Sequence, residues 1–210
     1  KRWTCLKSAH ELYFAGHLID AAVAHFRATG RRNFLDAMCR YDDYIASVFV
    51  RGKGQKRGYP GHEEIELALC KLAKVTGKKK YLDLAKYFVD ERGQSPNYFL
   101  KENPQWTPRQ LENHQALKPV REEKNAVGHS VRAVYLYSAM ADVAQAMGDK
   151  ELLRACETVF DSISTRRMYL TGGIGSERGS EAFENDYNLP DHSAYAESCA
   201  SIGLVFFASR

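Results

Sequence analysis

Three helical hairpins built around the same internal glycine constrain the fold of this chain more than any other feature. Aligned on that glycine, the segments ATGRRNFLDAMCRYDDYI, VTGKKKYLDLAKYFVDER and AMGDKELLRACETVFDSI superimpose. Apolar residues at helical spacing precede each glycine and resume after it, so Gly30, Gly77 and Gly148 are predicted helix C-caps. Repeated units that each form one helical hairpin indicate an all-α toroid or solenoid. Variable connections at one end of each pair favour the toroid.

The periodicity predicts seven long helices. The hairpins are expected over residues 8–29 and 33–50, 62–76 and 81–90, and 124–147 and 150–166, and the seventh helix runs from about Ser198 to the end. A long polar connection with four prolines separates the second hairpin from the third: Pro96, Pro104, Pro108 and Pro119.

Composition and charge exclude several classes of protein. The chain has 210 residues, of which 44% are hydrophobic, enough to bury a core. Its net charge of +4 is mild and its basic residues are scattered, so nucleic acid is not an expected partner. The longest apolar run, near 202–208, is far shorter than the roughly 20 residues of a membrane span, and no signal segment opens the chain. We therefore expect a soluble, cytoplasmic protein that has no membrane partner, with its five cysteines reduced and mostly filling the core.

Each hairpin carries a Gly-His pair near the start of its first helix, which gives His17, His62 and His129. If the three positions are equivalent, three imidazoles lie at one end of a ring. A single histidine on a helix is more often a core or capping group. The recurrence in all three hairpins is what favours a shared polar pocket.

A long acidic, glycine-rich stretch, Tyr169 to Leu204, separates the third hairpin from the last helix and begins that helix. Loops of this length inside a compact domain are usually functional. Two converging carboxylates, such as Glu181 and Glu197, can protonate a leaving group and support a nucleophile or a metal-bound group on the other side. Aromatic residues such as Tyr195 would supply apolar walls. Four other acids compete for the same roles: Glu177, Glu184, Asp186 and Asp191.

Glu197 and Cys199 form a second feature of this stretch. Residues two apart do not share a face of a regular helix, so both contact one ion only from a pre-helical turn or a first turn. Thiolate, carboxylate and imidazole together are a plausible zinc set, but two ligands do not make a site. Two interpretations stay open: part of a zinc site, or a buried thiol next to a solvated or capping glutamate.

The motifs TGGIGS, EAFENDYNLP and AYAESCASIGL, in this order, resemble the signature of glycoside hydrolase family 127, the β-L-arabinofuranosidases and their relatives. Three further segments are similar to the inner and outer helices of that family's barrel: ELYFAGHLIDAAVAHF, GHEEIELALCKLAKVTGKKKYLDLAKYFVDERG and HQALKPVREEKNAVGHSVRAVYLY. The resemblance covers nearly the whole chain. It implies an (α/α)6 barrel of which about seven of twelve helices lie here, so residues 1–210 would be one partial catalytic domain, truncated at its C-terminal side.

The resemblance also implies residue roles. Members of the family are retaining enzymes in which a zinc-bound cysteine thiolate attacks the anomeric carbon and a glutamate acts first as acid and then as base. Glu181, in the EAF motif, matches that acid/base, and Glu197 and Cys199, in YAESCA, match two zinc ligands. The histidines that match substrate-contacting residues are His17, His62 and His129. The family's nucleophile belongs to a Cys-Cys pair farther downstream, and this chain contains no such pair.

Two functional hypotheses follow. In the first, the parent protein is a retaining glycosidase that binds Zn2+ and releases terminal β-L-arabinofuranose, or a similar furanose, from a carbohydrate substrate. In the second, the 210-residue chain is a non-catalytic helical remnant that binds sugar weakly, or forms homo-oligomers through apolar faces at its open ends. A sugar epimerase acting through histidines on the same toroid is a third reading, because a fold alone does not fix a function.

Overall fold

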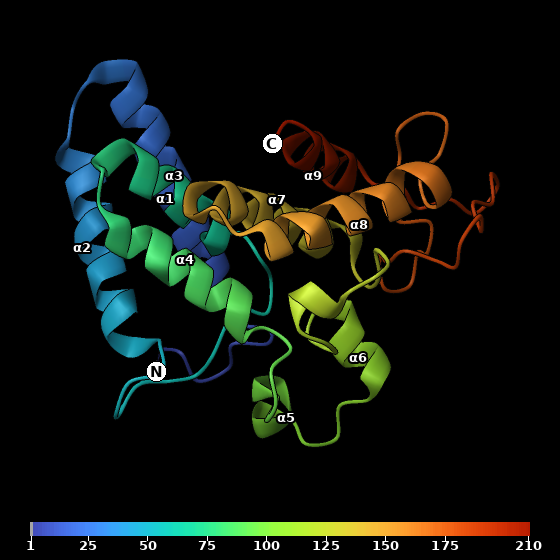
Figure 1. Ribbon diagram of the computed structural model, residues 1–210, viewed down its shortest axis with the longest axis horizontal. Helices are drawn as coiled ribbons and strands as arrows, with labels where there is room; N and C mark the ends of the chain where they lie inside the picture. Colours follow the sequence, from blue (N-terminus) through green and yellow to red (C-terminus); the bar gives the residue numbers. More distant parts are fainter. Residues whose placement is uncertain (1) are drawn as a thin grey trace. The chain divides into compact units, whose positions relative to one another are not determined.

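The computed structural model describes residues 2–210 (Figure 1). Within this range the chain forms nine α-helices, one short 3-10 helix and no β-strand, which confirms the all-α class. The chain divides into two compact units, the first ending at Glu91 and the second beginning at Arg92.

The first unit consists of two helical hairpins. Its helices are α1 (Glu11–Thr29), α2 (Asn33–Val48), α3 (Ile65–Thr76) and α4 (Lys79–Glu91). The helix α1 packs against both α2 and α3, and α3 packs against α4. Gly30 and Gly77 end α1 and α3 in the left-handed conformation, with φ of 69° and 67°, and their amides donate to the carbonyls of Phe26 and Ala73. These two predicted C-caps are confirmed.

A close approach of backbones joins α1 to α3. A Cβ atom added to Gly16 would lie 2.8 Å from the amide nitrogen of Ile65, so only glycine fits there without displacement. The buried face of α1 is apolar on both sides of Gly16 and includes Leu12 and Ile19. The beginning of α3 is thereby held against the middle of α1.

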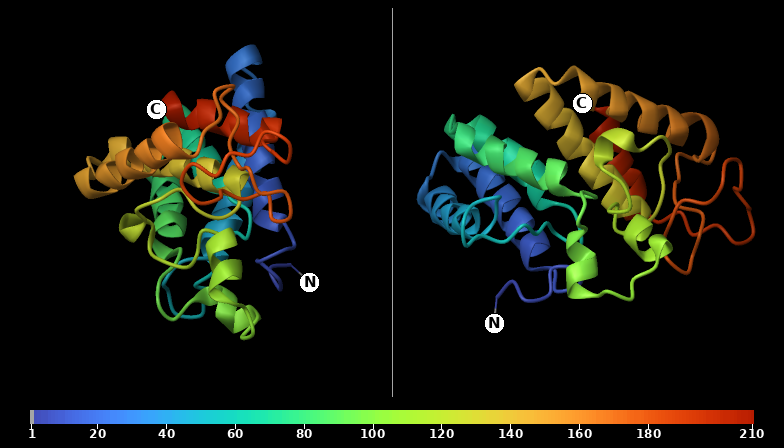
Figure 2. Two further views of the ribbon diagram at one scale, coloured as in Figure 1. Left: turned by 90° about the vertical axis from the view of Figure 1, so that its right-hand side faces the viewer. Right: turned by 60° about the horizontal axis from the view of Figure 1, so that its bottom comes forward.

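The second unit is built around a long buried helix. Its elements are α5 (Tyr98–Glu102), α6 (Pro108–Asn113), the 3-10 helix η1 (Val120–Glu122), α7 (Ser130–Met147), α8 (Lys150–Arg166) and α9 (Ser198–Ala208). The helix α7 packs against both α8 and α9, as the two views of Figure 2 show. Gly148 caps α7 with φ of 66°, as predicted, and the Asp149 side chain caps α8 by accepting from the Leu152 amide. Gly203 brings α9 against α7, because a Cβ there would lie 2.4 Å from Cγ2 of Val134.

The seven predicted helices are present, but the proline-rich connection holds two more, α5 and α6. The helix α6 begins with a capping box in which the Thr107 side chain accepts from the Gln110 amide, and Pro108 opens the helix. Three predicted starts were too early, since α1 begins at Glu11, α3 at Ile65 and α7 at Ser130. The residues before each of these helices are extended or turn segments that carry a histidine.

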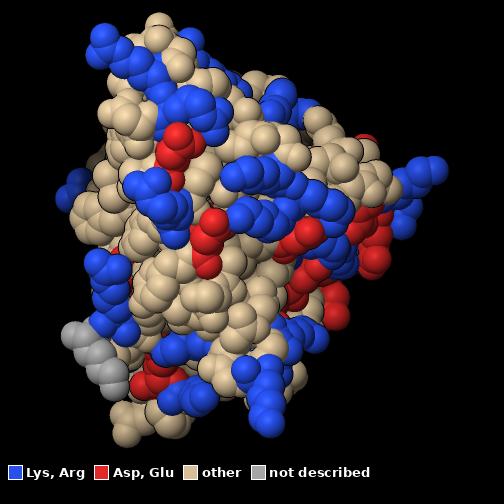
Figure 3. Space-filling model, turned by 90° about the vertical axis from the view of Figure 1, so that its left-hand side faces the viewer, with Lys and Arg blue, Asp and Glu red and all other residues tan. Residues whose placement is uncertain are grey.

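Charged side chains of both signs mix on the surface. Figure 3 shows Lys and Arg interspersed with Asp and Glu over one face. Several of them pair across neighbouring elements of the first unit, as Lys71 does with Asp20 at 2.5 Å. No helix within residues 2–210 has both the length and the apolar character needed to cross a bilayer. All five cysteines are free, and Cys39, Cys70 and Cys156 are buried, as predicted.

Candidate active site

The loop between α8 and α9 is fixed by backbone pairing rather than by regular structure. Glu177 and Ala182 exchange backbone hydrogen bonds of 3.1 and 3.2 Å, and Ala182 also pairs with His129 in an isolated antiparallel bridge. The Glu177 carboxylate accepts from the amides of Gly179 and Ser180 at 2.8 and 2.7 Å, and hydrogen bonding from Ser180 lowers its pKa. Glu177 therefore closes a tight turn, which is a structural role.

A second competing acid also has structural partners. The Asp186 carboxylate contacts Arg166 at 3.1 Å and Arg167 at 2.8 Å. Arg167 in turn donates to the carbonyl of Ala126 at 2.6 Å. Asp186 thus ties the loop to the end of α8, and two of the four acids that compete with Glu181 and Glu197 are accounted for by the architecture.

Glu181 lies at the end of the Glu177 turn in an unusual backbone conformation. Its φ is 55°, in the left-handed region that non-glycine residues seldom adopt. Its carbonyl oxygen accepts two hydrogen bonds from Ser130, one from the amide and one from the hydroxyl, each of 2.9 Å. Because Ser130 is the first residue of α7, the main chain of Glu181 is anchored to the central helix of its unit.

The Glu181 carboxyl belongs to a group of four side chains linked by polar contacts. We call this group the carboxylate cluster, and its members are His129, Glu181, Tyr195 and Glu197. Nε2 of His129 lies 2.9 Å from Oε2 of Glu181. The Tyr195 hydroxyl lies 3.1 Å from Oε1 of Glu181 and 3.1 Å from Oε2 of Glu197. The structure therefore brings the two predicted carboxylates to the same hydroxyl, and Tyr195 contributes this polar bridge rather than only an apolar wall.

Burial determines the charge of the cluster's imidazole. It lowers the pKa of His129 to about 4, and the neighbouring Arg132 acts in the same direction. His129 is therefore neutral near pH 7, and its contact with Glu181 is a hydrogen bond rather than an ion pair. Hydrogen bonds to Glu181 and Glu197 raise the pKa of Tyr195 to about 12, so its hydroxyl keeps its proton.

Glu197 and Cys199 stand at the beginning of α9, in the first-turn arrangement that a shared ion requires. Glu197 occupies the N-cap position, but its side chain makes no capping hydrogen bond and reaches Tyr195 instead. Cys199 is exposed. The thiol is therefore not buried and Glu197 does not cap the helix, which contradicts these parts of the second interpretation; a solvated glutamate stays open. The donor types suit zinc, but no group of three or more His, Cys, Asp and Glu able to hold a metal occurs within residues 2–210. Two donors are only half of the four ligands that a zinc ion usually takes.

The three predicted histidines do not occupy equivalent positions. His17 lies in the second turn of α1, His62 three residues before α3, and His129 directly before α7. His17 and His62 belong to the first unit and His129 to the second. The hairpins align at their C-cap glycines, but their first helices begin at different distances from those glycines, so the histidines are out of register.

His17 and His62 do come together, around a residue that the sequence analysis missed. Both rings contact the Tyr13 ring in T-shaped geometry, at centroid distances of 4.5 and 4.6 Å. His10 joins them, 5.8 Å from Tyr13 and 6.0 Å from His62. His17 also lies 3.3 Å from the buried carboxylate of Glu64. The signal was present, because residues 10, 13 and 17 are spaced for one helix face.

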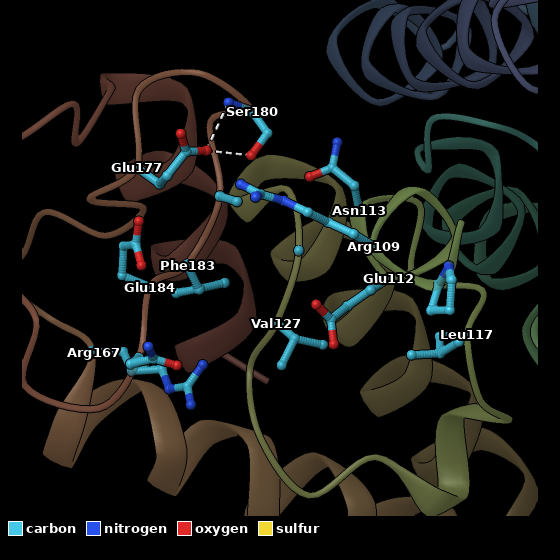
Figure 4. Close-up of a pocket in the computed structure, with 14 residues that line it drawn as sticks. Arg109, Glu112, Asn113, Leu117, Val127, Arg167, Glu177, Ser180, Phe183 and Glu184 are labelled. Carbon is cyan, nitrogen blue, oxygen red and sulfur yellow. Dashed lines mark hydrogen bonds between the residues drawn. The ribbon is translucent and has the colours of Figure 1, made fainter. Parts of the chain in front are cut away.

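A cavity of about 500 Å³ opens in the second unit beside the segment that carries Glu181 (Figure 4). Arg109 and Asn113 of α6 face Glu177 and Ser180 of the loop across it. Oδ1 of Asn113 is buried without a hydrogen-bond partner in the described part of the chain. The other lining residues are Pro108, Glu112, Leu117, Val127, Gly128, Arg167, Ala182, Phe183, Glu184 and Asn185.

The site thus lies on an all-α scaffold of helical hairpins, whose long loop brings two carboxylates and a neutral imidazole together. Paired carboxylates are the side chains that glycoside hydrolysis uses. Comparison with protein families identifies the particular family. The chain belongs to the family described as beta-L-arabinofuranosidase, GH127 catalytic domain, whose profile matches residues 1–210.

Relatives agree with this assignment. A curated protein from Bifidobacterium longum subsp. longum, named non-reducing end beta-L-arabinofuranosidase, is 38% identical, with 100% of this chain and 33% of the relative covered. The crystal structure of a GH127 beta-L-arabinofuranosidase from Geobacillus stearothermophilus T6 is 56% identical with a TM-score of 0.97, over 100% of this chain and 34% of that one. A further GH127 beta-arabinofuranosidase structure is 46% identical with a TM-score of 0.89, and the match covers 99% of this chain and 31% of that one. The chain thus spans about a third of the length of these relatives.

Proposed function

We propose that the protein containing this chain is a retaining glycoside hydrolase that releases terminal β-L-arabinofuranose, or a similar furanose, from a carbohydrate. The observation that carries the proposal is the Glu181 carboxyl, which is held by His129 and Tyr195 at the position that matches the family's acid/base. The names of the relatives supply the substrate class.

In this proposal Glu181 gives its proton to the glycosidic oxygen of the leaving group, and later takes a proton from the water that completes hydrolysis. The neighbouring His129 imidazole is compatible with both steps. A neutral imidazole nitrogen donates to an ionised carboxylate in one tautomer and accepts from a protonated carboxyl in the other. His129 can therefore stay bonded to Glu181 in either protonation state. The histidines proposed to contact the sugar are His17, His62 and His129.

Glu197 and Cys199 are proposed to hold zinc together with ligands from beyond this chain. When bound, zinc lowers the pKa of a coordinated thiol and fixes its orientation, which makes a sulfur nucleophile workable at neutral pH. What this chain contributes is a carboxylate oriented by Tyr195 and an exposed thiol in the first turn of α9. The nucleophilic cysteine would come from the longer protein.

The finer architecture is also part of the proposal. We infer that the hairpins belong to an (α/α)6 barrel, as the family resemblance implies, and that the rest of the barrel lies in the longer protein, since the chain spans about a third of its relatives. The isolated 210-residue chain is then inactive. The alternative, a non-catalytic remnant that self-associates, is favoured by one observation: Ile202, Val205 and Phe206 of α9 are exposed.

The test uses the full-length protein and an aryl β-L-arabinofuranoside. Release of L-arabinose is expected, with a loss of about 10²- to 10⁴-fold in Glu181→Ala. Asp191→Asn, which changes an exposed acid of the same loop, is the control and should keep wild-type activity. Full activity in Glu181→Ala would contradict the assignment. Turnover by the isolated chain would contradict the need for a nucleophile from outside it.

A further inference from the structure

We propose that Tyr195 is a positioning residue that fixes the orientation of the Glu181 carboxyl by linking it to Glu197 through a single hydroxyl. The inference rests on the proposed function, because it assigns Tyr195 a part in proton donation by Glu181. It begins from two equal contacts, since the hydroxyl oxygen lies 3.1 Å from each carboxylate. Tyr195 is the first residue of the YAESCA motif, but the sequence suggests only an apolar wall for it and does not show that its hydroxyl bridges two carboxylates.

The Glu181 carboxyl needs such a partner because packing does not hold it. Its side chain is 41% exposed, and the last torsion of a glutamate has broad, shallow preferences. His129 binds one oxygen, Oε2, and Tyr195 binds the other, Oε1. With both contacts present the plane of the carboxyl is fixed. With one contact alone, the group can rotate about the remaining hydrogen bond.

The backbone positions Tyr195 independently of its hydroxyl. Its amide donates to the carbonyl of Ser176 at 3.4 Å, and the amide of Ala196 donates to the carbonyl of Gly175 at 2.9 Å. Ala196 has φ of 42°, so the chain turns between Tyr195 and Glu197, whose side chains are hydrogen-bonded to each other. Replacing the hydroxyl by hydrogen leaves these backbone contacts in place, so Tyr195→Phe isolates the effect of the hydroxyl.

An acid that is poorly oriented matters only when the leaving group needs its proton. Aryl arabinofuranosides with a very acidic phenol, such as 2,4-dinitrophenol, leave without protonation, whereas alkyl or methoxyphenyl groups depend on it. Tyr195→Phe should therefore lower kcat/KM about tenfold or more for the poor leaving groups and hardly change it for dinitrophenyl. A purely structural defect would lower all of these rates equally.

The experiment compares the wild-type full-length protein, Tyr195→Phe and the control Tyr187→Phe over this leaving-group series. Tyr187 is in the same loop, its side chain is 72% exposed, and no hydrogen bond of its hydroxyl is found in the described residues. Crystal structures of wild type and Tyr195→Phe supply a readout that does not depend on activity. The expected results are a leaving-group-dependent loss in Tyr195→Phe only, and a rotated or divided Glu181 carboxyl in its structure.

Two results would overturn the inference. One is an unmoved Glu181 carboxyl in the Tyr195→Phe structure. The other is an equal loss on all leaving groups together with loss of bound zinc, which would place the effect at Glu197 alone. If wild type hydrolyses no arabinofuranoside, the proposed function fails, and the crystallographic comparison still decides whether Tyr195 positions Glu181.

Discussion

Ser130 holds Glu181 with two hydrogen bonds, because its amide and its hydroxyl both donate to the Glu181 carbonyl oxygen at 2.9 Å. Ser130 is fully buried and begins the longest helix of its unit. The main chain of the proposed acid is thus anchored to a rigid element, while its carboxyl is oriented by side chains. These two hydrogen bonds hold the Glu181 backbone in its left-handed conformation, despite the strain that this conformation has for a non-glycine residue.

Ser130→Ala should reduce turnover more than it reduces stability. The amide bond to Glu181 remains and the hydroxyl bond is lost, which costs about 1 kcal/mol of folding free energy. We expect kcat to fall severalfold with little change in KM, because Glu181 gains freedom to move. Denaturant unfolding and steady-state kinetics measure the two effects.

The matched control is Ser138→Ala. Ser138 is equally buried in α7, but its hydroxyl donates to the Val134 carbonyl within the same helix, at 2.8 Å. The Ser138→Ala variant should lose about as much folding free energy as Ser130→Ala, or less, and should keep the wild-type kcat. Equal kcat in the two variants would show that the Ser130 hydroxyl does not align Glu181.

Gly175→Ala should destabilise the protein more than Gly172→Ala, although both glycines have a positive φ and lie in the same loop. Gly175 has φ of 77°, and an added Cβ would lie 2.4 Å from Oγ of Ser130. The variant must displace Ser130, and with it Glu181. Gly172 has φ of 84° with nothing within 4 Å of its added Cβ, so Gly172→Ala should cost only about 1–2 kcal/mol for the left-handed conformation. Similar unfolding free energies for the two variants would contradict the steric argument.

Local patterns predicted the hairpins and their ends well. The three C-cap glycines have φ between 66° and 69°, and α8 has its predicted bounds, because glycine and apolar periodicity act within a few residues of the structure they determine. The capping box at Thr107 was equally readable and would have revealed α6. The early predicted starts of α3 and α7 extended helical periodicity into segments that make long-range contacts instead.

The carboxylate cluster depended on contacts that no local pattern encodes. Glu181 and Glu197 were selected from many acids by the family resemblance rather than by spacing. What brings them together is the bridge between His129 and Ala182, the anchor on Ser130 and the turn at Ala196, all of which pair residues far apart in sequence or adopt positive φ. Tyr195 was read as an apolar wall because its hydroxyl partners were unknown.

Asp42→Asn should remove a pH dependence of stability. Asp42 on α2 is fully buried, and neither carboxyl oxygen has a hydrogen-bond partner within the described residues. Its pKa is raised to about 7, mainly by burial and also by the neighbouring Asp43, while Lys80 acts in the opposite direction. Since the folded state binds this proton more tightly than the unfolded state, stability falls as the pH rises from about 4 through 7, by up to about 1.4 kcal/mol per pH unit.

Asp42→Asn should therefore raise the unfolding temperature at pH 8 and change it little near pH 4. Thermal unfolding of the full-length protein at several pH values measures this. Asp36→Asn, which alters an acid of the same helix paired with Arg32 at 2.9 Å near the surface, should show no comparable gain at pH 8. A gain that is the same at both pH values would mean that the proton on Asp42 is not the cause.

The isolated 210-residue chain should self-associate through α9. Ile202, Val205 and Phe206 are 52%, 66% and 39% exposed, and their spacing of three and four residues gives them one helix face. Light scattering after size exclusion should show dimers or larger species, and Val205→Glu should shift them towards monomer. Leu170→Glu is the control, because Leu170 is fully exposed but stands alone in a loop. A monomeric wild-type chain, or an equal effect of both substitutions, would show that this face does not drive association.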